Sequence, residues 1–413
     1  MSQRSVPAHA LPWVVVGIVL VALSLRGPII APTPVITQLQ SDLGLSAATA
    51  GLLTGLPVLL FALATPLASK LIGRFGPEAA VLVCLTGVLA GTVVRSAGPA
   101  PVVLAGTVVI GAAIAVGNIV VPVIIRRDVP WRRIPTVTAA YTAALNLGSM
   151  ITALGTAPLA AVVGWRWALV SWGVLTLAAL VFWLVVARRR TGTPPAASTP
   201  AEPSTATGTL RQARGTGQVR RIGWWLTLAF CGQAFSYYSV TAWLPTLLAD
   251  TRGLSLAASG ASASLFQVAA IAGALGVPLL ADRAPAWTPV VLVGGLWIAL
   301  PVGLLLAPEG YLVWSVIGGV AQGGGFTTIF SIVARIVRTD AEAAATSARI
   351  QGAGYLAATV GPPLVGALNA GTGGWTVPLL VVLGATLVFL AGGLLAVAET
   401  RPTHKSPSVE ASQ

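Results

Sequence analysis

Long runs of apolar residues separated by short polar intervals dominate the chain. A membrane-spanning helix needs about 20 mainly apolar residues, so we scanned the chain for runs of that length. The predicted helices cover residues 11–39, 47–72, 78–95, 100–125, 134–162, 166–187, 222–249, 256–281, 288–307, 310–334, 346–370 and 374–397. The pattern thus predicts an all-α membrane protein with twelve transmembrane helices.

Composition excludes a soluble protein. Of 413 residues, 55% are hydrophobic and 8% are charged, whereas soluble domains carry about 25% charged residues. The excess of 24 Lys and Arg over 11 Asp and Glu does not indicate nucleic-acid binding, because the basic residues lie in short loops between apolar runs. Both cysteines, Cys84 and Cys231, lie within apolar runs and are expected to pack between helices. His9 and His404 lie in polar tails, so we expect neither a metal site nor a cofactor.

The polar intervals divide the chain into two halves. The longest interval is rich in Pro, Ala, Thr and Ser, a composition that cannot bury enough apolar surface to fold. The expected parts are an N-terminal tail at 1–10, a six-helix bundle at 11–187, a linker at 188–221, a second six-helix bundle at 222–397 and a C-terminal tail at 398–413.

The two halves resemble each other weakly. NLGSMITALGTAPL (146–159) aligns with QGAGYLAATVGPPL (351–364), and DLGLSAATAGLL (42–53) aligns with RGLSLAASGASA (252–263). Repeated halves are typical of transporters whose substrate site lies near the membrane midplane, at the interface between the repeats. We therefore expect two pseudo-symmetric bundles with a site between them.

The distribution of Lys and Arg predicts the orientation. With the N-terminus inside, 20 of these residues fall on the inner side and three, Arg95, Arg166 and Arg252, fall on the outer side. Cytoplasmic loops carry an excess of Lys and Arg. The sequence therefore predicts a multi-pass protein of the plasma membrane with both termini in the cytoplasm.

Arg26 is the one basic residue that falls well inside a predicted span and not near its end. Residues 11–25 alone are too short to cross a bilayer, so the helix is expected to continue through Arg26. A charge near the bilayer centre costs about 2.5–3.5 kcal/mol on insertion scales, and such residues usually serve function. The planar guanidinium suits a carboxylate, nitro or cyanate group. The alternative is that Arg26 reaches the outer interface through its flexible stem.

Several motifs carry a family resemblance. They include SLRGPI (24–29), DLGLSAATAGLLTGLPVLLFALATPLA (42–68), VGNIVVPVIIRRDVP (116–130), AAY (139–141), GWRWALVSWG (164–173), PLLADR (278–283) and QGAGYLAATVGP (351–362). Through them, residues 20–400 resemble the cyanate-permease and 2-nitroimidazole-transporter (CynX/NimT) family of the major facilitator superfamily. This resemblance implies two bundles that rock around a central cavity and expose it to each side alternately.

Two positions depart from the family pattern. Ser24 stands where the family usually has Asn before Leu-Arg, which bears on the substrate. Gly73 precedes Arg74 where superfamily members usually have Asp, whereas the second half keeps Asp282-Arg283. The second departure weakens the expectation of a complete network of gating charges in the first half.

Polar residues within the predicted spans are candidates for the substrate site. By the alignment of the halves, Tyr237 and Tyr238 lie at the depth of Arg26, and Gln233 is polar at a similar depth. The resemblance places the fourth and tenth helices along the pathway, which favours Asn118 and Gln322. The further candidates are Asn146, Gln267, Gln351 and Tyr355. The alternative for each is a hydrogen bond between helices.

Charged residues at inner helix ends are candidates for gating. The set comprises Arg74, Arg126, Arg127, Asp128, Asp282 and Arg283. The superfamily resemblance implies that such charges close the inner gate in the outward-open state. The alternative is a set of solvated ion pairs, each worth less than about 1 kcal/mol.

The sequence therefore predicts a secondary transporter, and not an enzyme, for a small anion or polar molecule of cyanate-like or nitroimidazole-like chemistry. Every acidic residue falls in a loop, a tail or the end of a span and none in the middle of a span, so uniport, exchange or proton movement with the substrate is favoured. Efflux of drugs is an alternative, and a membrane-embedded transferase or a transporter-like sensor are alternatives of other classes. The expected partners are the substrate and the lipid bilayer, and the expected functional unit is a monomer.

Overall fold

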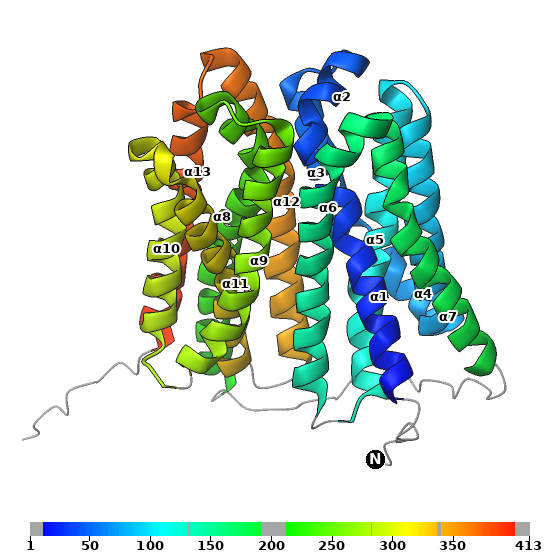
Figure 1. The fold of residues 1–413 in the computed structure, drawn as a ribbon. Coiled ribbons are helices and arrows are strands. Elements are labelled where there is room, and N and C mark those ends of the chain that lie inside the picture. The colour runs from blue at the N-terminus through cyan, green and yellow to red at the C-terminus, as the bar shows by residue number, and fades with distance from the viewer. Residues whose placement is uncertain (1–10, 131–132, 191–211, 282, 337–339, 401–413) are drawn as a thin grey trace, which may run out of the picture.

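The structure is a computed structural model that describes residues 11–130, 133–190, 212–281, 283–336 and 340–400. Every regular element in these ranges is a helix (Figure 1). The elements are α1 (Leu11–Ile30), η1 (Thr33–Val35), α2 (Ile36–Leu43), α3 (Ala47–Leu63), α4 (Thr65–Ala97), α5 (Ala100–Asp128), α6 (Ile134–Ser171), α7 (Gly173–Arg190), α8 (Gln212–Arg252), α9 (Leu256–Ala281), α10 (Trp287–Leu306), η3 (Pro308–Gly310), α11 (Tyr311–Ile336), α12 (Asp340–Thr372) and α13 (Thr376–Thr400).

Two of these helices contain a sharp turn that separates consecutive predicted spans. Gly76 in α4 has φ 83° and Gly164 in α6 has φ 79°. Residues with a Cβ rarely adopt this backbone conformation, whereas glycine adopts it freely. α4 therefore holds the end of the second predicted span and all of the third, and α6 holds the fifth span and the start of the sixth.

Eight segments of the described chain are long and apolar enough to cross a membrane. One of them, Thr136–Val186, has 51 residues and passes through the turn at Gly164, so it contains two crossings (Figure 1). α8 and α12 are not among the eight. Both are long helices with several polar residues, and both contribute to the cavity described below.

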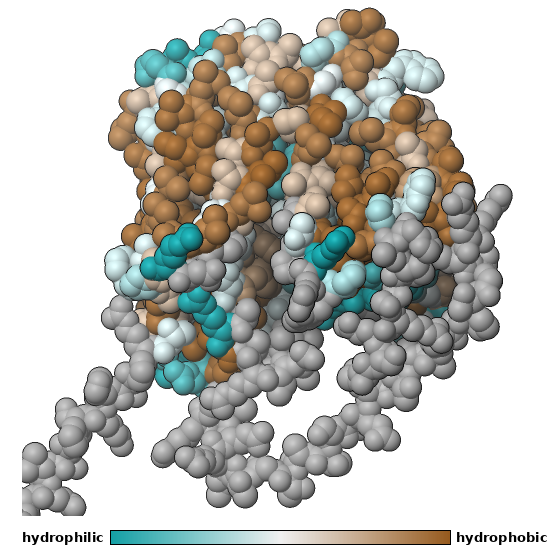
Figure 2. All heavy atoms as spheres, turned by 60° about the horizontal axis from the view of Figure 1, so that its bottom comes forward, coloured by the Kyte–Doolittle hydropathy of each residue, from teal (hydrophilic) through white to brown (hydrophobic). Residues whose placement is uncertain are grey.

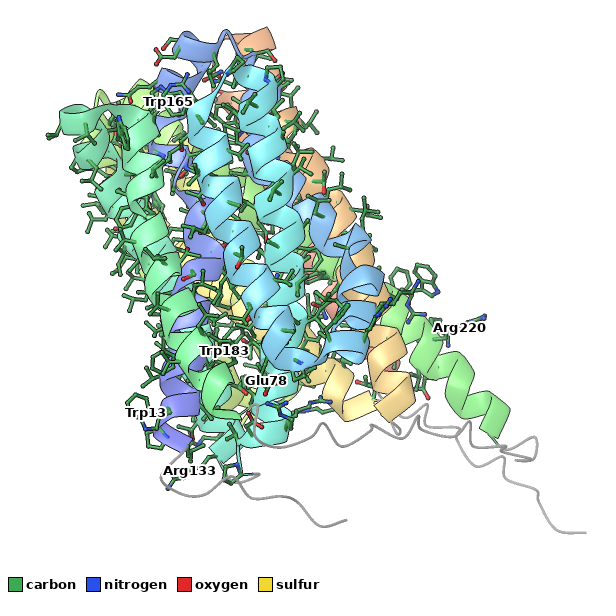
Figure 3. The ribbon with its side chains drawn as sticks, turned by 90° about the vertical axis from the view of Figure 1, so that its right-hand side faces the viewer. Trp13, Glu78, Arg133, Trp165, Trp183 and Arg220 are labelled. Carbon is green, nitrogen blue, oxygen red and sulfur yellow. The ribbon has the colours of Figure 1, made fainter. Side chains whose placement is uncertain are left out.

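Two ends of the bundle can be defined by the direction of the helices. We call the end where α1 begins at Leu11 the basal end, and the opposite end, where Gly44, Gly164 and Gly253 turn the chain, the apical end (Figure 1). Figure 3 shows Trp165 at the apical end and Glu78, Arg133 and Arg220 at the basal end. In Figure 2 the sides of the molecule are mostly hydrophobic, as a lipid-facing surface requires, and hydrophilic residues gather towards the two ends.

The boundary of α8 differs from the predicted one. We expected the helix to begin near residue 222, but it begins at Gln212. At the basal end the extension is tied to α13, because Arg221 pairs with Glu399 at 3.1 Å and Gln218 donates a hydrogen bond of 2.6 Å to the Glu399 carbonyl oxygen. The rest of the predicted linker, residues 191–211, and both predicted tails lie outside the described residues.

The first half, α1 to α7, lies beside the second half, α8 to α13 (Figure 1). The halves meet where α3 packs on α12 and α6 packs on α9. Glycines bring the backbones close at both contacts: a Cβ on Gly51 would lie 2.6 Å from the Pro362 carbonyl, and one on Gly260 would lie 2.8 Å from the Ala153 carbonyl oxygen. Small residues commonly form such helix contacts in membranes.

Both halves carry the same bracing contact at the apical end. The Trp165 indole nitrogen donates a hydrogen bond of 2.7 Å to Asp42, and the Trp375 indole nitrogen donates one of 2.9 Å to Asp250. Each aspartate lies near the end of the first membrane crossing of its half. Asp42 comes shortly before Gly44, which has φ 64°, and Asp250 comes shortly before Gly253, which has φ 63°. The two halves therefore share an equivalent hydrogen bond between a tryptophan and an aspartate.

Candidate functional site

A cavity of about 900 Å³ lies between the two halves. Helices α1, α3, α5 and α6 line it from the first half, and α8, α9, α11 and α12 line it from the second. Towards the basal end its lining residues Pro122, Arg126 and Thr138 are exposed, whereas Ile29 and Ile30 towards the apical end are buried. The cavity is therefore accessible from the basal end and closed towards the apical end by the α3–α12 and α6–α9 contacts.

The packing of α1 turns Arg26 towards this cavity. Successive residues of an α-helix point about 100° apart. Leu25 is fully buried against Gly117 of α5, and Gly27 packs against Thr152 of α6. With the two neighbouring positions held against α5 and α6, the side chain of Arg26 is left to face the second half.

Arg26 contacts Tyr237 across the interface between the halves. Its Nη1 donates a hydrogen bond of 2.8 Å to the Tyr237 hydroxyl, and its Cζ lies 5.5 Å from the centre of the same ring. The second distance is within the range of a cation–π contact. Tyr237 itself is 5% exposed and stacks on Phe266 with 6.2 Å between ring centres.

The cavity carries positive charge. Arg26 and Arg126 line it, and no acidic residue is among its lining residues in the described part of the chain. Within that part, Arg26 also has no carboxylate partner in an ion pair. Opposite charges attract more strongly in a cavity with low-dielectric walls than in water. The arrangement is therefore suited to a ligand with negative or partially negative oxygen atoms.

Most of the predicted binding residues meet at this cavity. Its lining includes Arg26, Asn118, Asn146, Tyr237, Tyr238, Gln322, Gln351 and Tyr355. Gln267 is the exception: it is buried outside the lining and its Nε2 donates to the Thr241 hydroxyl at 3.4 Å. That contact joins α9 to α8, which matches the alternative of a hydrogen bond between helices.

The site has components beyond the proposed binding set. Gln233 was noted in the sequence for its polarity and depth, and it lines the cavity while its Nε2 donates a hydrogen bond of 3.0 Å to the Gln322 carbonyl oxygen. The phenylalanines of an aromatic cluster were missed, since a phenylalanine in an apolar run has no signal that separates a cavity position from a lipid-facing one. The cluster consists of Phe61, Phe230, Phe326, Phe330 and Tyr355, with ring centres 4.5–6.0 Å apart.

The predicted gating residues at the basal end of α5 form contacts within the first half. Arg127 pairs with Glu78 at 2.5 Å and with Asp128 at 2.7 Å. Glu78 begins the second part of α4, so these bonds tie α4 to α5. Arg126 instead lines the cavity.

The other predicted gating residues that the structure describes, Arg74 and Arg283, are exposed and form no ion pair with another described residue. Arg74 is exposed, and its guanidinium lies 5.3 Å from the ring centre of Phe75. Arg283 is exposed and its backbone nitrogen donates to the Leu280 carbonyl. Asp282 lies outside the described residues. Among the ion pairs between described residues of the basal end, Arg127 with Glu78 and Asp128 lies within the first half and Arg221 with Glu399 lies within the second.

Two further residues, Ser24 and Arg95, lie near the end of α1, and the contacts of neither were predicted. The Ser24 hydroxyl donates to the Leu20 carbonyl of its own helix at 3.0 Å, and Ser24 is not part of the cavity lining. Arg95 was predicted on the outer side, at the end of a predicted span, but its burial was not predicted. It lies in the last turn of α4, is 1% exposed, and donates a hydrogen bond to the Pro28 carbonyl of α1.

Comparison with known proteins assigns the family. Residues 14–347 match the Major Facilitator Superfamily. The chain is 32% identical to the uncharacterized transporter YycB of Bacillus subtilis over 92% of each chain, and 31% identical to the 2-nitroimidazole transporter of Escherichia coli over 92% of this chain and 94% of that one. It is 26% identical to the cyanate transport protein CynX of E. coli over 90% and 95%.

Solved structures agree with the fold. A bacterial homologue of the human lysosomal transporter Spinster, in an inward-facing and unoccupied conformation, superposes with a TM-score of 0.70 over 95% of each chain at 16% identity. A D-xylose–proton symporter superposes with a TM-score of 0.68 over 94% of this chain and 96% of that one at 14% identity. The chain therefore belongs to the Major Facilitator Superfamily and is a membrane transporter.

Proposed function

We propose that the protein carries a small planar molecule with an anionic, nitro or other electron-rich group across the plasma membrane by alternating access. One observation carries this proposal: Arg26 lies in a cavity between the two halves, and no acid is among the described residues lining it. A guanidinium without a carboxylate partner favours a ligand that offers negative or partially negative acceptor atoms to its planar donors. Similarity to the nitroimidazole and cyanate transporters supports the same substrate chemistry.

The aromatic cluster narrows the shape of the substrate. Phe61, Phe230 and Tyr355 present ring faces and edges in the same cavity that holds Arg26. Aromatic pairs gain about 0.5–1.5 kcal/mol beyond burial of area. A ring-bearing substrate with an electron-rich substituent would use both parts of the cavity, whereas cyanate would use only the polar part. We therefore favour nitroheterocycle-like over cyanate-like substrates.

The proposed orientation places the basal end in the cytoplasm. Of the Lys and Arg residues outside the first span, the sequence assigns 20 to the inner side and three to the outer side, as the positive-inside rule requires. The conformation described above is then inward-open. The gating proposal follows: Arg74, Arg126, Arg127, Asp128, Asp282 and Arg283 would form contacts between the halves when the basal end closes.

Efflux of larger aromatic drugs is a second candidate. The observation in its favour is the cavity volume of about 900 Å³, which is in the range of pockets that hold drug-sized ligands. In this case the aromatic cluster would dominate binding and Arg26 would contribute little. The two candidate functions therefore differ in the substitution that should reduce transport most: loss of Arg26 for the first, and loss of the aromatic cluster for efflux.

The test is transport by the full chain in proteoliposomes, with 2-nitroimidazole, cyanate and a neutral aromatic dye as probes. Arg26→Met should abolish saturable transport of the first two, whereas Arg252→Met, which removes an exposed arginine at the apical end of α8, should not. If Arg26→Met transports 2-nitroimidazole and cyanate at wild-type rates, the proposal is wrong. Loss of dye transport in Phe230→Ala together with unchanged dye transport in Arg26→Met would favour the efflux candidate.

A further inference from the structure

Three prolines, Pro28 in the last turn of α1 and Pro32 and Pro34 just after it, interrupt the helical hydrogen bonding at this end. In an α-helix each carbonyl accepts from the N–H four residues later. Pro32 and Pro34 have no N–H, so the carbonyls of Pro28 and Ile30 lose their helical partners. A buried carbonyl without a partner is costly. Both Pro28 and Ile30 are buried.

Two side chains supply the missing donors. The Thr33 hydroxyl donates to the Ile30 carbonyl at 2.9 Å, a local contact within the same turn. Arg95 comes from α4, 67 positions away, and its Nη1 donates to the Pro28 carbonyl at 2.5 Å. The break in α1 is therefore completed by a cation from another helix.

Arg95 has little else to compensate its charge. It is 1% exposed, and its Nε and Nη2 are buried without a hydrogen-bond partner. Among the described residues it has no carboxylate partner in an ion pair. The C-terminal end of a helix carries partial negative charge on its open carbonyls, and α1 ends at Ile30, two residues after Pro28. The open end of α1 is therefore the counter-charge of Arg95.

We propose that Arg95 is a positioning residue, which holds the broken end of α1 and thereby fixes the direction of Arg26 in the cavity. Pro28 follows Arg26 by two residues, and Ala31 still bonds to the Gly27 carbonyl at 2.8 Å, so the segment moves as one turn. Without Arg95 the Pro28 carbonyl must find another donor, and that turn rotates. The inference rests on the proposed anion-binding role of Arg26, but the contact between Arg95 and Pro28 does not.

The prolines allow a rescue experiment. Pro32 already has helical backbone angles, φ −67° and ψ −25°, so alanine fits there and brings back the N–H that the Pro28 carbonyl lacks. In Arg95→Met the carbonyl loses its donor, and in the double variant Arg95→Met/Pro32→Ala the backbone supplies one. Pro34→Ala is the matched control, because the N–H that it restores faces the Ile30 carbonyl, which Thr33 already satisfies.

The variants are compared as full-length protein in detergent and in proteoliposomes. The first readout is the KM and the maximal rate for 2-nitroimidazole and cyanate. The second is the rate at which phenylglyoxal modifies Arg26, followed by mass spectrometry, which requires no substrate. The third is hydrogen exchange of the backbone over residues 20–36.

We expect Arg95→Met to raise KM about tenfold, the effect expected from loss of a hydrogen bond to a charged group. The same variant should raise the rate at which phenylglyoxal modifies Arg26. It should also speed backbone hydrogen exchange after residue 27. Arg95→Met/Pro32→Ala should return all three values most of the way to wild type, and Arg95→Met/Pro34→Ala should not. Pro32→Ala alone should leave KM near the wild-type value, because the Pro28 carbonyl oxygen has two lone pairs and can accept from the restored N–H and from Arg95 together.

The inference is overturned if Arg95→Met lowers thermal stability but leaves KM and the modification of Arg26 unchanged, since Arg95 would then be structural only. It is also overturned if Pro34→Ala rescues as well as Pro32→Ala. If the wild-type protein transports neither probe, the proposed function fails. The modification rate and hydrogen exchange of the same variants then still decide whether Arg95 positions Arg26.

Discussion

Arg26 in α1 donates a hydrogen bond of 2.8 Å to the hydroxyl of Tyr237 in α8, and so joins the two halves of the protein at the cavity. The donor lies on the first crossing of one half and the acceptor on the first crossing of the other. A substrate oxygen that binds Arg26 competes with this hydroxyl. In the proposed function, this contact is part of the substrate site, and the substrate replaces it during transport.

Replacement of Arg26 by lysine separates charge from geometry. Arg26→Lys keeps the positive charge but loses the planar pair of donors. We expect kcat/KM for 2-nitroimidazole to fall about tenfold or more, with expression and thermal stability near wild type. Uptake kinetics in proteoliposomes measure this. An unchanged kcat/KM would show that charge alone suffices.

Removal of the Tyr237 hydroxyl tests the competition. In Tyr237→Phe the guanidinium has one donor free, so a substrate no longer displaces a hydrogen bond worth about 0.5–1.5 kcal/mol. We expect KM to fall by about threefold to tenfold. Tyr238→Phe is the control, because Tyr238 lines the same cavity but forms no hydrogen bond to Arg26. A rise in KM in Tyr237→Phe would mean that the tyrosine supports the substrate instead of competing with it.

A larger side chain at Gly51, in the α3–α12 contact, should open the apical end. A Cβ on Gly51 would lie 2.6 Å from the backbone of Pro362 and Pro363, and overpacking costs about 1–3 kcal/mol. In a chain with Cys84→Ala, Cys231→Ala and Ile30→Cys, the further change Gly51→Leu should speed labelling of the new cysteine by an external, impermeant thiol reagent about tenfold.

The matched control for this experiment is Gly73→Leu. A Cβ at Gly73 has no atom within 4 Å, so this substitution should leave the labelling rate unchanged. Equal acceleration by both leucines would contradict the assignment of the α3–α12 contact as the apical closure.

The paired braces should contribute equally to stability. Asp42→Ala and Asp250→Ala each remove the acceptor of a buried indole N–H. We expect each to cost about 1 kcal/mol, seen as a lower thermal midpoint in detergent, and the double variant to be additive within about 0.5 kcal/mol. Glu309→Ala, an exposed apical acid, serves as the control. A large effect in one half only would contradict the structural equivalence.

Transport should respond weakly to a pH gradient. No acid is among the described residues that line the cavity, so nothing there offers the carboxylate relay common in proton-driven transporters. With 2-nitroimidazole as substrate and its protonation state held constant, an imposed gradient should change the uptake rate less than about twofold. Strong stimulation would show that a proton carrier lies elsewhere in the chain.

Much of the helical architecture could be predicted from the sequence, because span length and the position of prolines and loops are local properties. The sharp turns at Gly76 and Gly164 mark the ends of predicted spans, and Arg26 was identified because a charge within an apolar run has few explanations. The alignment of the two halves placed Tyr237 at the depth of Arg26, because equivalent positions of repeated halves lie at similar depths.

The rotation of each helix could not be predicted in this way. Gln233 and Gln267 are both glutamines within spans of the second half, yet only Gln233 lines the cavity. Phe230 has the same local sequence character as a lipid-facing phenylalanine. Arg95 lies at the end of a predicted span, where solvent exposure is the usual expectation, and its burial depends on the unsatisfied carbonyl of a helix distant in sequence. These features depend on tertiary packing alone.

The bond between Trp165 and Asp42 and the bond between Trp375 and Asp250 each remain within one half. In the proposed alternating-access cycle, rocking of the halves would leave both braces intact, and their strength would not enter the barrier to the conformational change. That barrier falls instead on contacts that cross the interface, such as Gly51 against Pro362. Evolution could accordingly adjust turnover at the interface and thermal tolerance at the braces as two separate traits.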